Sequence, residues 1–253
     1  MLRFFSELLR KAAVSNIHLY DIVRRSAADI SFLLPHDEAF FGLAKFGDGS
    51  RCMLDIGAND GISARSYRKL VPNRPILSIE ANPFHKHRLE RVKAELTNFD
   101  YRLIAAGSEP GQLILFTPVY KGVTLTNYAS MSPEIARANL SRHMRIRDLG
   151  TKAEFLESCS QVTTIDDLGL DPKLVKIDVE GYEAQVVAGM SETIKTSRPV
   201  LMIEHNPASF PELKRFFSVL DYRIASYDRR SDVFLEFDES DPDLNVFFIP
   251  IEA

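Results

Sequence analysis

Short apolar runs recur along the chain, and most of them end in an acidic or small residue. They lie at residues 53–56, 76–80, 101–106, 174–179, 200–203, 222–227 and 245–249. Nearly continuous apolar runs of this length are typical of parallel strands that are buried on both faces. We therefore predict a sheet whose central strands are parallel and fully enclosed.

Segments with helical spacing separate these runs. The clearest ones lie at residues 63–70, at 83–96 with Pro83 in the first turn, and at 211–220. Alternating strands and helices predict an α/β fold, in which a doubly wound, mostly parallel sheet is flanked by helices. We find no internal repeat and no linker, so residues 47–253 are expected to form one domain.

Two regions fall outside this alternation. Residues 1–46 read as a helical extension packed on the core. Its first apolar positions, Leu2, Phe5, Leu8 and Leu9, lie beside a basic flank, a pattern that also suits peripheral contact with a membrane surface. Residues 117–160 read as an insertion that contains a basic helix, and long insertions in compact domains are commonly functional.

Charge and cysteine content narrow the class of protein. The 253 residues carry a net charge of −4, which gives no support to nucleic acid as a partner. The two cysteines, Cys52 and Cys159, lie far apart without the spacing of a metal site, so we expect a reducing, cytoplasmic environment. No run is long and apolar enough to cross a bilayer.

The stretch that follows the first predicted strand carries the main candidate chemistry. Asp55 lies within the apolar run, and Gly57, Ala58, Asn59 and Gly61 follow it where a helix begins. Glycines permit a tight turn, and the amides that open a helix carry a partial positive charge. Amides together with an acid suit a small ligand that carries both a carboxylate and a cation, or a ribose.

The spacing of this turn argues against dinucleotide binding. A dinucleotide turn has the pattern G-x-G-x-x-G, whereas here Asn59 stands where that pattern needs a glycine. The second predicted strand ends in Glu80, at the distance where α/β folds of this kind place an acid on ribose hydroxyls.

Four blocks in this order resemble the FkbM-type family of class I S-adenosylmethionine (SAM) methyltransferases. They are Asp-Ile-Gly-Ala-Asn-x-Gly at 55–61, Ser-Ile-Glu-Ala-Asn-Pro at 78–83, Leu-Val-Lys-Ile-Asp-Val-Glu-Gly-Tyr-Glu at 174–183 and Arg-Pro-Val-Leu-Met-Ile-Glu at 198–204. The resemblance implies a class I methyltransferase fold, SAM as cofactor, and methylation of a hydroxyl on a sugar, glycolipid, oligosaccharide or other natural product. It also implies that the insertion covers the acceptor.

Carried onto this chain, the resemblance implies a cofactor site with separate subsites. Asp55 would attract the cationic end of SAM, and Glu80 would hold the ribose diol. Ala105 or Ala106 would flank the adenine, and the methionine half would lie among the loop residues Gly57, Ala58, Asn59 and Gly61.

Three residues are candidates for the base that takes the proton of the acceptor. Asp178, Glu180 and His205 follow the fourth and fifth predicted strands, on the side where the methyl group would lie. An acid at such a position is also a common helix N-cap, and a lone histidine is more often structural. Asp178, Glu204 and Asn206 offer oxygen ligands for a divalent metal, but proximity of carboxylates alone does not favour a metal site.

Other features of the sequence stay outside the predicted site. His85 and His87 belong to a basic helix face that we interpret as solvated. Residues 142–147 are basic enough to grip a phosphate or a sugar acid, although an exposed segment explains them equally well. An NAD-dependent oxidoreductase and a non-catalytic SAM-binding module remain the alternatives. The acceptor and the oligomeric state are not predicted.

Overall fold

The computed structural model of the protein describes residues 16–22, 35–144, 152–239 and 245–251. Its core is an eight-stranded sheet in the order β11-β10-β12-β9-β8-β1-β2-β3. The five strands from β9 to β3 are parallel, whereas β12, β10 and β11 join in antiparallel pairs. The bounds are β1 Met53–Ile56, β2 Ile76–Glu80, β3 Phe99–Leu103, β8 Leu174–Ile177, β9 Val200–Glu204, β10 Tyr222–Asp228, β11 Val233–Glu236 and β12 Asn245–Pro250. The α/β fold with a mostly parallel sheet that the sequence predicts is confirmed.

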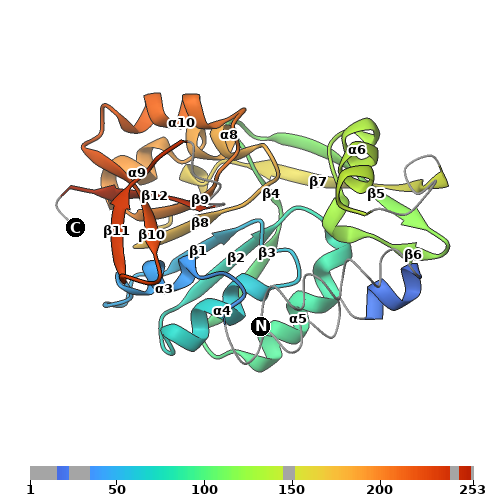
Figure 1. Ribbon diagram of the computed structural model, residues 1–253, viewed down its shortest axis with the longest axis horizontal. Coiled ribbons are helices and arrows are strands. Elements are labelled where there is room, and N and C mark those ends of the chain that lie inside the picture. Colours follow the sequence, from blue (N-terminus) through green and yellow to red (C-terminus); the bar gives the residue numbers. More distant parts are fainter. Residues whose placement is uncertain (1–15, 23–34, 145–151, 240–244, 252–253) are drawn as a thin grey trace.

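Helices cover both faces of this sheet (Figure 1). On one face lie α3 (Ala39–Ala44), α4 (Ile62–Leu70) and α5 (Lys86–Glu95), and on the other lie α8 (Glu183–Ala188), α9 (Ser191–Ser197) and α10 (Phe210–Phe217). Each face has its own apolar core. The central strands β1 and β8 have no exposed position. This explains why their sequences are mostly apolar and do not alternate between apolar and polar residues.

A second, four-stranded sheet lies beside the first, at the right of Figure 1. Its order is β4-β7-β5-β6, and its long strands β5 and β7 pair antiparallel. The bounds are β4 Ala105–Ala106, β5 Gly111–Tyr120, β6 Val123–Thr124 and β7 Glu154–Thr163, and α6 is Pro133–His143. The predicted insertion at 117–160 is therefore the outer part of a separate sheet that begins earlier, with β4.

Two strand predictions need correction. The run at 101–106 was expected to form one strand, but β3 ends at Leu103 and the chain passes through Ile104 into β4 of the second sheet. The strand β11 was not predicted. Its Val233 and Leu235 are largely exposed, so it lacks the buried apolar run by which the other strands are recognised.

The described part of the N-terminal extension packs on the second sheet and on the first. Residues 17–22 are helical, and Ile17 and Tyr20 are buried against side chains such as Leu140 of α6. Residues 35–38 lead into α3. Leu2, Phe5, Leu8 and Leu9, and also Arg145 and Arg147 of the basic stretch, lie outside the described residues. Within the described ranges, no helix combines the length and apolar character needed to span a bilayer.

The order of the strands fixes where a ligand can bind. The chain runs from β1 outward to β2 and β3, and later returns to β8 on the other side of β1. In such open sheets the crevice beyond the carboxyl ends of the strands, at the point where the order reverses, is the usual binding site. That point lies between β1 and β8.

Candidate functional site

The turn after β1 needs glycine at two positions. Gly57 has φ +80°, and a Cβ atom there would lie 1.8 Å from the backbone oxygen of Asp178. Gly61 has φ +74° and precedes α4, and a Cβ atom there would lie 2.6 Å from Val92 Cγ2. The loop can therefore approach β8 and α5 this closely only because both positions lack a side chain.

The backbone amides of this turn donate hydrogen bonds to other groups of the protein. Gly57 N and Ala58 N donate to the carbonyl oxygen of Ile79 at 2.9 and 3.1 Å, and Gly61 N donates to Ala58 O. Asn59 N donates to Glu80 Oε2 at 2.7 Å. The sequence predicted that these amides face a ligand; instead the amides of Gly57, Ala58 and Asn59 bond to β2, and that of Gly61 bonds within the turn.

We expect the substitution Gly57→Ala to destabilise the fold more than Gly122→Ala does. Both glycines have positive φ, which for alanine costs about 1–3 kcal/mol. Gly122, in the turn between β5 and β6, has nothing within 4 Å of the added Cβ, whereas at Gly57 the backbone of Asp178 must also move. Chemical denaturation of the two variants measures the difference, and equal losses would contradict the close packing of the turn.

Glu80 at the end of β2 lies at the centre of the site. It is 8% exposed. Its Oε2 accepts a hydrogen bond from the backbone N–H of Asn59, and its Oε1 accepts one from the backbone N–H of Asn82 at 2.7 Å. Each carboxylate oxygen has a second lone pair, so Glu80 can still accept two hydrogen bonds from a ligand such as a diol.

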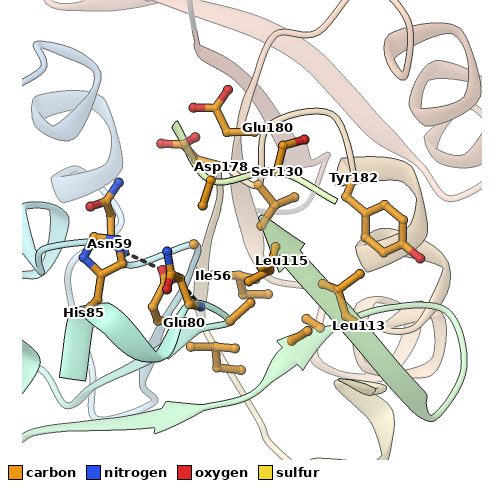
Figure 2. A pocket seen from close by; sticks show the side chains of 18 of the residues that line it. Ile56, Asn59, Glu80, His85, Leu113, Leu115, Ser130, Asp178, Glu180 and Tyr182 are labelled. Atoms are coloured by element: carbon orange, nitrogen blue, oxygen red, sulfur yellow. Dashed lines mark hydrogen bonds between the residues drawn. The ribbon is translucent and has the colours of Figure 1, made fainter. Parts of the chain in front are cut away.

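A cavity of about 190 Å³ opens beside Glu80 at the carboxyl edge of β1, β2 and β8. Figure 2 shows Glu80, Asn59 and His85 on one side of it, Leu113 and Tyr182 on the other, and Asp178 and Glu180 at the remaining edge. The predicted residues that line it are Gly57, Asn59, Glu80, Ala105, Ala106, Asp178 and Glu180. Asp55, Ala58, Gly61 and His205 are not among its lining residues.

The second sheet covers the cavity. Leu113 and Leu115 of β5 form an apolar wall, and Asn127, Ser130 and Met131 approach from the segment between β6 and α6. One side of the cavity is therefore built from the doubly wound sheet and the other from the predicted insertion together with β5.

The residues of the cavity fit an adenosyl group that carries an amino acid. Ala105 and Ala106 are small and buried, so a flat base can lie against them. Glu80 provides the carboxylate for a diol. Asn59 Oδ1 is buried and has no hydrogen-bond partner in the described structure, so it is an acceptor available to an ammonium group. These groups suit SAM, as the sequence predicts.

A buried lysine that the sequence analysis did not identify connects β1 and β8. Lys176 Nζ lies 3.5 Å from Asp55 Oδ1 and 3.3 Å from Asp178 Oδ2, and it donates to Gly57 O at 3.0 Å. Lys176 is 4% exposed and Asp55 is fully buried, where Asp55 also accepts a hydrogen bond from Ser78. Asp55 therefore neutralises Lys176 beneath the loop, which corrects the prediction that it contacts the cofactor directly.

These contacts set the charge of Asp178. Burial acts to lower the pKa of Lys176, but the carboxylates of Asp178 and Asp55 outweigh it and raise that pKa above its usual value. Burial acts to raise the pKa of Asp178, but the charge of Lys176 and a hydrogen bond from Glu204 lower it below its usual range. Asp178 is thus an ionised carboxylate whose side chain is 40% exposed at the edge of the cavity.

Glu204 at the end of β9 shares a proton with Asp178. Burial raises the pKa of Glu204 to about 9, and the charges of Asp178 and Glu180 act in the same direction. At neutral pH the pair therefore carries one negative charge and one proton, and the two groups titrate together. From its sequence position Glu204 was predicted only as a possible metal ligand.

We expect Glu204→Gln to reduce the loss of stability that occurs as the pH rises from about 5 to 8. The pKa of Glu204 is raised in the folded protein, so between its ordinary value and about 9 the folded state holds a proton that the unfolded chain has released. Stability attributable to this group therefore falls as pH rises through that window, and glutamine does not ionise. Urea denaturation from roughly pH 5 to pH 8 measures the slope. Glu236→Gln, at an exposed position of β11, is the matched control.

The remaining two predicted catalytic residues differ in position. Glu180 lines the cavity and has φ +54°. The turn that holds it is fixed by Glu183, whose Oε1 accepts a hydrogen bond from Gly181 N and whose Oε2 accepts one from Ser209 Oγ. His205 instead packs edge-on against the rings of Phe210 and Phe237. His205 is not among the residues that line the cavity, so its ring contacts give no support to the prediction that it is catalytic.

His85 was excluded from the site by the sequence analysis, and the structure includes it. Its side chain is 2% exposed, lines the cavity, and places Nδ1 2.9 Å from Asp60 Oδ1. Arg88 contacts the other oxygen of Asp60 at 3.3 Å. The available signal was the position of His85, two residues after Pro83, in the first turn that follows the acid-terminated strand. Within the described ranges, no group of three histidine, cysteine or acidic residues could hold a metal ion.

One protein-family model covers most of the chain. Residues 55–224 match the family model described as the methyltransferase FkbM domain. A search of curated proteins found no match.

Solved structures with similar folds include methyltransferases of several kinds. One is methyltransferase FkbM from Methylobacillus flagellatus KT, with 18% identity over 79% of this chain and 43% of that one, and a TM-score of 0.49. A precorrin-6y C5,15-methyltransferase from Geobacter metallireducens GS-15 has 15% identity over 83% and 85% of the two chains, and a TM-score of 0.40. A tRNA (uracil-54, C5)-methyltransferase from Pyrococcus abyssi has 13% identity over 83% and 36%, and a TM-score of 0.40. The chain thus spans less than half the length of the first of these proteins.

Proposed function

The chain belongs to the FkbM methyltransferase family, and from that premise we propose that it is a SAM-dependent O-methyltransferase whose acceptor is a hydroxyl of a sugar, glycolipid, oligosaccharide or other natural product. The observation that carries the proposal is the ionised carboxylate of Asp178 at the edge of the cavity, across from the groups that suit an adenosyl ligand.

The cofactor would be held by residues of β2, β4 and the turn after β1. Glu80 binds the ribose diol, and Asn59 Oδ1 accepts a hydrogen bond from the ammonium group of the methionine half. Ala105 and Ala106 face the adenine. Because Gly57 has no side chain, the loop can lie close to the backbone of Asp178 beside the cavity. When bound, SAM supplies a methyl group that its sulfonium has already activated.

The chain's own contribution is alignment and removal of a proton. Holding an acceptor oxygen in line with the methyl group can supply about 7–11 kcal/mol of the barrier. Asp178 takes the proton of the acceptor hydroxyl, and Lys176 stabilises the carboxylate until it does so. Glu180 lies at the rim and binds a second acceptor hydroxyl. The proton that Glu204 shares with Asp178 keeps the pair at one negative charge.

The lining of the covered side suits a hydroxyl-rich acceptor. Thr126, Asn127 and Ser130 bring hydroxyl and amide groups to the cavity, and among the described residues that line it there is no lysine or arginine. Polar, uncharged groups of this kind form hydrogen bonds with hydroxyls without demanding a charged partner.

Two measurements test the proposal. Calorimetric titration compares SAM, S-adenosylhomocysteine (SAH) and NAD, and we expect only the first two to bind. Incubation with methyl-labelled SAM and candidate glycans, glycolipids and small hydroxylated compounds then identifies the acceptor, and we expect the label in an alkali-stable ether. Binding of NAD in place of SAM, or label recovered on nitrogen or carbon, would contradict the proposal.

We expect Glu80→Ala to weaken SAH binding by about tenfold or more, because a hydrogen bond to a charged group contributes about 1.5–3 kcal/mol. Calorimetric titration measures the loss. Glu109→Ala, in the exposed turn before β5, is the control and is expected to bind normally. Unchanged affinity in Glu80→Ala would remove the ribose role.

A further inference from the structure

A buried histidine lines the cavity but takes no part in the proposed function. His85 ends η1 (Pro83–His85), a short 3₁₀ helix after β2, and it is 2% exposed. Its Nδ1 lies 2.9 Å from Asp60 Oδ1, and Arg88 contacts the other oxygen of Asp60 at 3.3 Å. Asp60 is 5% exposed. The ring is therefore held by a carboxylate that is itself buried and paired with a cation.

The contact with Asp60 determines which ring nitrogen is available to a ligand. A carboxylate oxygen accepts hydrogen bonds, so Nδ1 of His85 donates to Asp60. Among the described residues, this is the only hydrogen bond of the His85 side chain. Nε2 therefore remains available to a ligand. Figure 2 shows the ring on the side of the cavity where Asn59 and Glu80 lie.

One charged group of SAM has no partner among the residues assigned to the cofactor. The methionine half carries a carboxylate beside the ammonium group that is assigned to Asn59 Oδ1. The backbone amides of the turn after β1 already donate hydrogen bonds within the protein. Three of the described residues that line the cavity, Glu80, Asp178 and Glu180, are acids. Like charges repel, so a carboxylate that enters this cavity needs a cation beside it.

His85 can provide this cation. Among the described residues around the cavity there is no lysine or arginine, and His85 is the only side chain there that can become positively charged. Its position also fits, because the ammonium and the carboxylate of an amino acid are bonded to the same carbon atom. Asn59, assigned to the ammonium group, directly precedes Asp60, which holds the ring.

We propose that His85 binds the amino acid carboxylate of the cofactor through Nε2, and that Asp60 is the positioning residue that stabilises the ring as an imidazolium. The inference rests on the proposed use of SAM and is independent of the acceptor. Both ring nitrogens donate in this arrangement, which requires the cationic form of the ring. Charges then alternate in sign from Arg88 through Asp60 and His85 to the carboxylate, so none of them is left unpaired.

The test compares two ligands that differ only in the carboxylate. They are SAH and decarboxylated SAH, in which a hydrogen atom replaces that group, and calorimetric titration measures the affinity of the full chain for each. We expect His85→Ala to bind SAH about tenfold or more weakly than wild type, the usual effect of losing a hydrogen bond between charged groups. Decarboxylated SAH should bind both proteins equally, which would also show that the variant is folded around the cavity.

Three further variants extend the comparison. Asp60→Asn keeps an oxygen that accepts from Nδ1 but removes the charge, so we expect a smaller loss of SAH affinity and none for decarboxylated SAH. His85→Gln fills similar space without a charge and should bind SAH about as weakly as His85→Ala, which it replaces if the alanine variant is unstable. His87→Ala, at an exposed position of α5, is the matched control and should bind both ligands like wild type.

Equal losses of affinity for the two ligands in His85→Ala and His85→Gln would overturn the proposal, because His85 would then contact another part of the cofactor. Unchanged SAH affinity in these variants, a comparable loss in His87→Ala, or equal binding of the two ligands by wild type would overturn it as well. A wild-type chain that binds neither ligand would instead refute the proposed use of SAM.

Discussion

The substitution Asp178→Asn is expected to lower the rate of methyl transfer by about 10²–10⁴-fold, the usual contribution of a positioned acid or base. Asparagine has nearly the same shape but cannot take the proton of an acceptor hydroxyl. SAH affinity should change little, because Lys176 keeps its contacts with Asp55 and with the carbonyl oxygen of Gly57. Single-turnover rates with methyl-labelled SAM, together with calorimetric titration of SAH, measure the two effects separately.

Asp100→Asn provides the matched control for this experiment. Asp100 is an exposed acid on β3 whose salt bridge with Lys93 resembles the Asp178–Lys176 contact but lies away from the cavity. Its substitution should leave the rate unchanged. Full turnover in Asp178→Asn would show that another group, such as Glu180, receives the proton.

The apolar runs and the acids that end them were sufficient to predict most of the sheet. β1, β2, β8 and β9 all lie where a mostly apolar run predicts them, because a strand buried on both faces carries few polar positions. The positions of Glu80 and Asp178 followed from the same signal, since the carboxyl ends of parallel strands meet at one edge of the sheet.

Which way an acid at that edge points could not be predicted. Asp55 and Glu80 both belong to strands that reach the edge, yet Asp55 is buried against Lys176 and Ser78, whereas Glu80 lines the cavity. The register of β1 against β8 decides this, since it pairs Asp55 directly with Lys176. No local pattern contains that pairing, because the two residues lie far apart in the sequence.

Contacts that join distant segments account for the other differences. The imidazole of His36 contacts the hydroxyl of Ser66, and His205 packs against the rings of Phe210 and Phe237 and does not line the cavity. A histidine on its own gives no signal that separates these two environments, since both rings are partly buried. The sequence did indicate a partner for Lys176, because a lysine inside an otherwise apolar strand must be paired with an acid. In the structure these acids are Asp55 and Asp178.

The substitution Lys176→Met is expected to destabilise the protein by about 3–5 kcal/mol, the usual cost of removing one partner of a buried ion pair. Methionine fills similar space but leaves Asp55, which is fully buried, with only the hydroxyl of Ser78 as a partner. Chemical denaturation at neutral pH measures the loss. Lys93→Met is the matched control, because the exposed Lys93–Asp100 pair contributes only about 0–1 kcal/mol.

The double variant Lys176→Met with Asp55→Asn distinguishes an unpaired charge from lost packing. Removing the orphaned carboxylate should recover part of the stability that Lys176→Met loses, so the two changes are expected to be strongly non-additive. Additive losses would mean that Asp55 and Lys176 contribute to stability independently, and would contradict the ion pair between them.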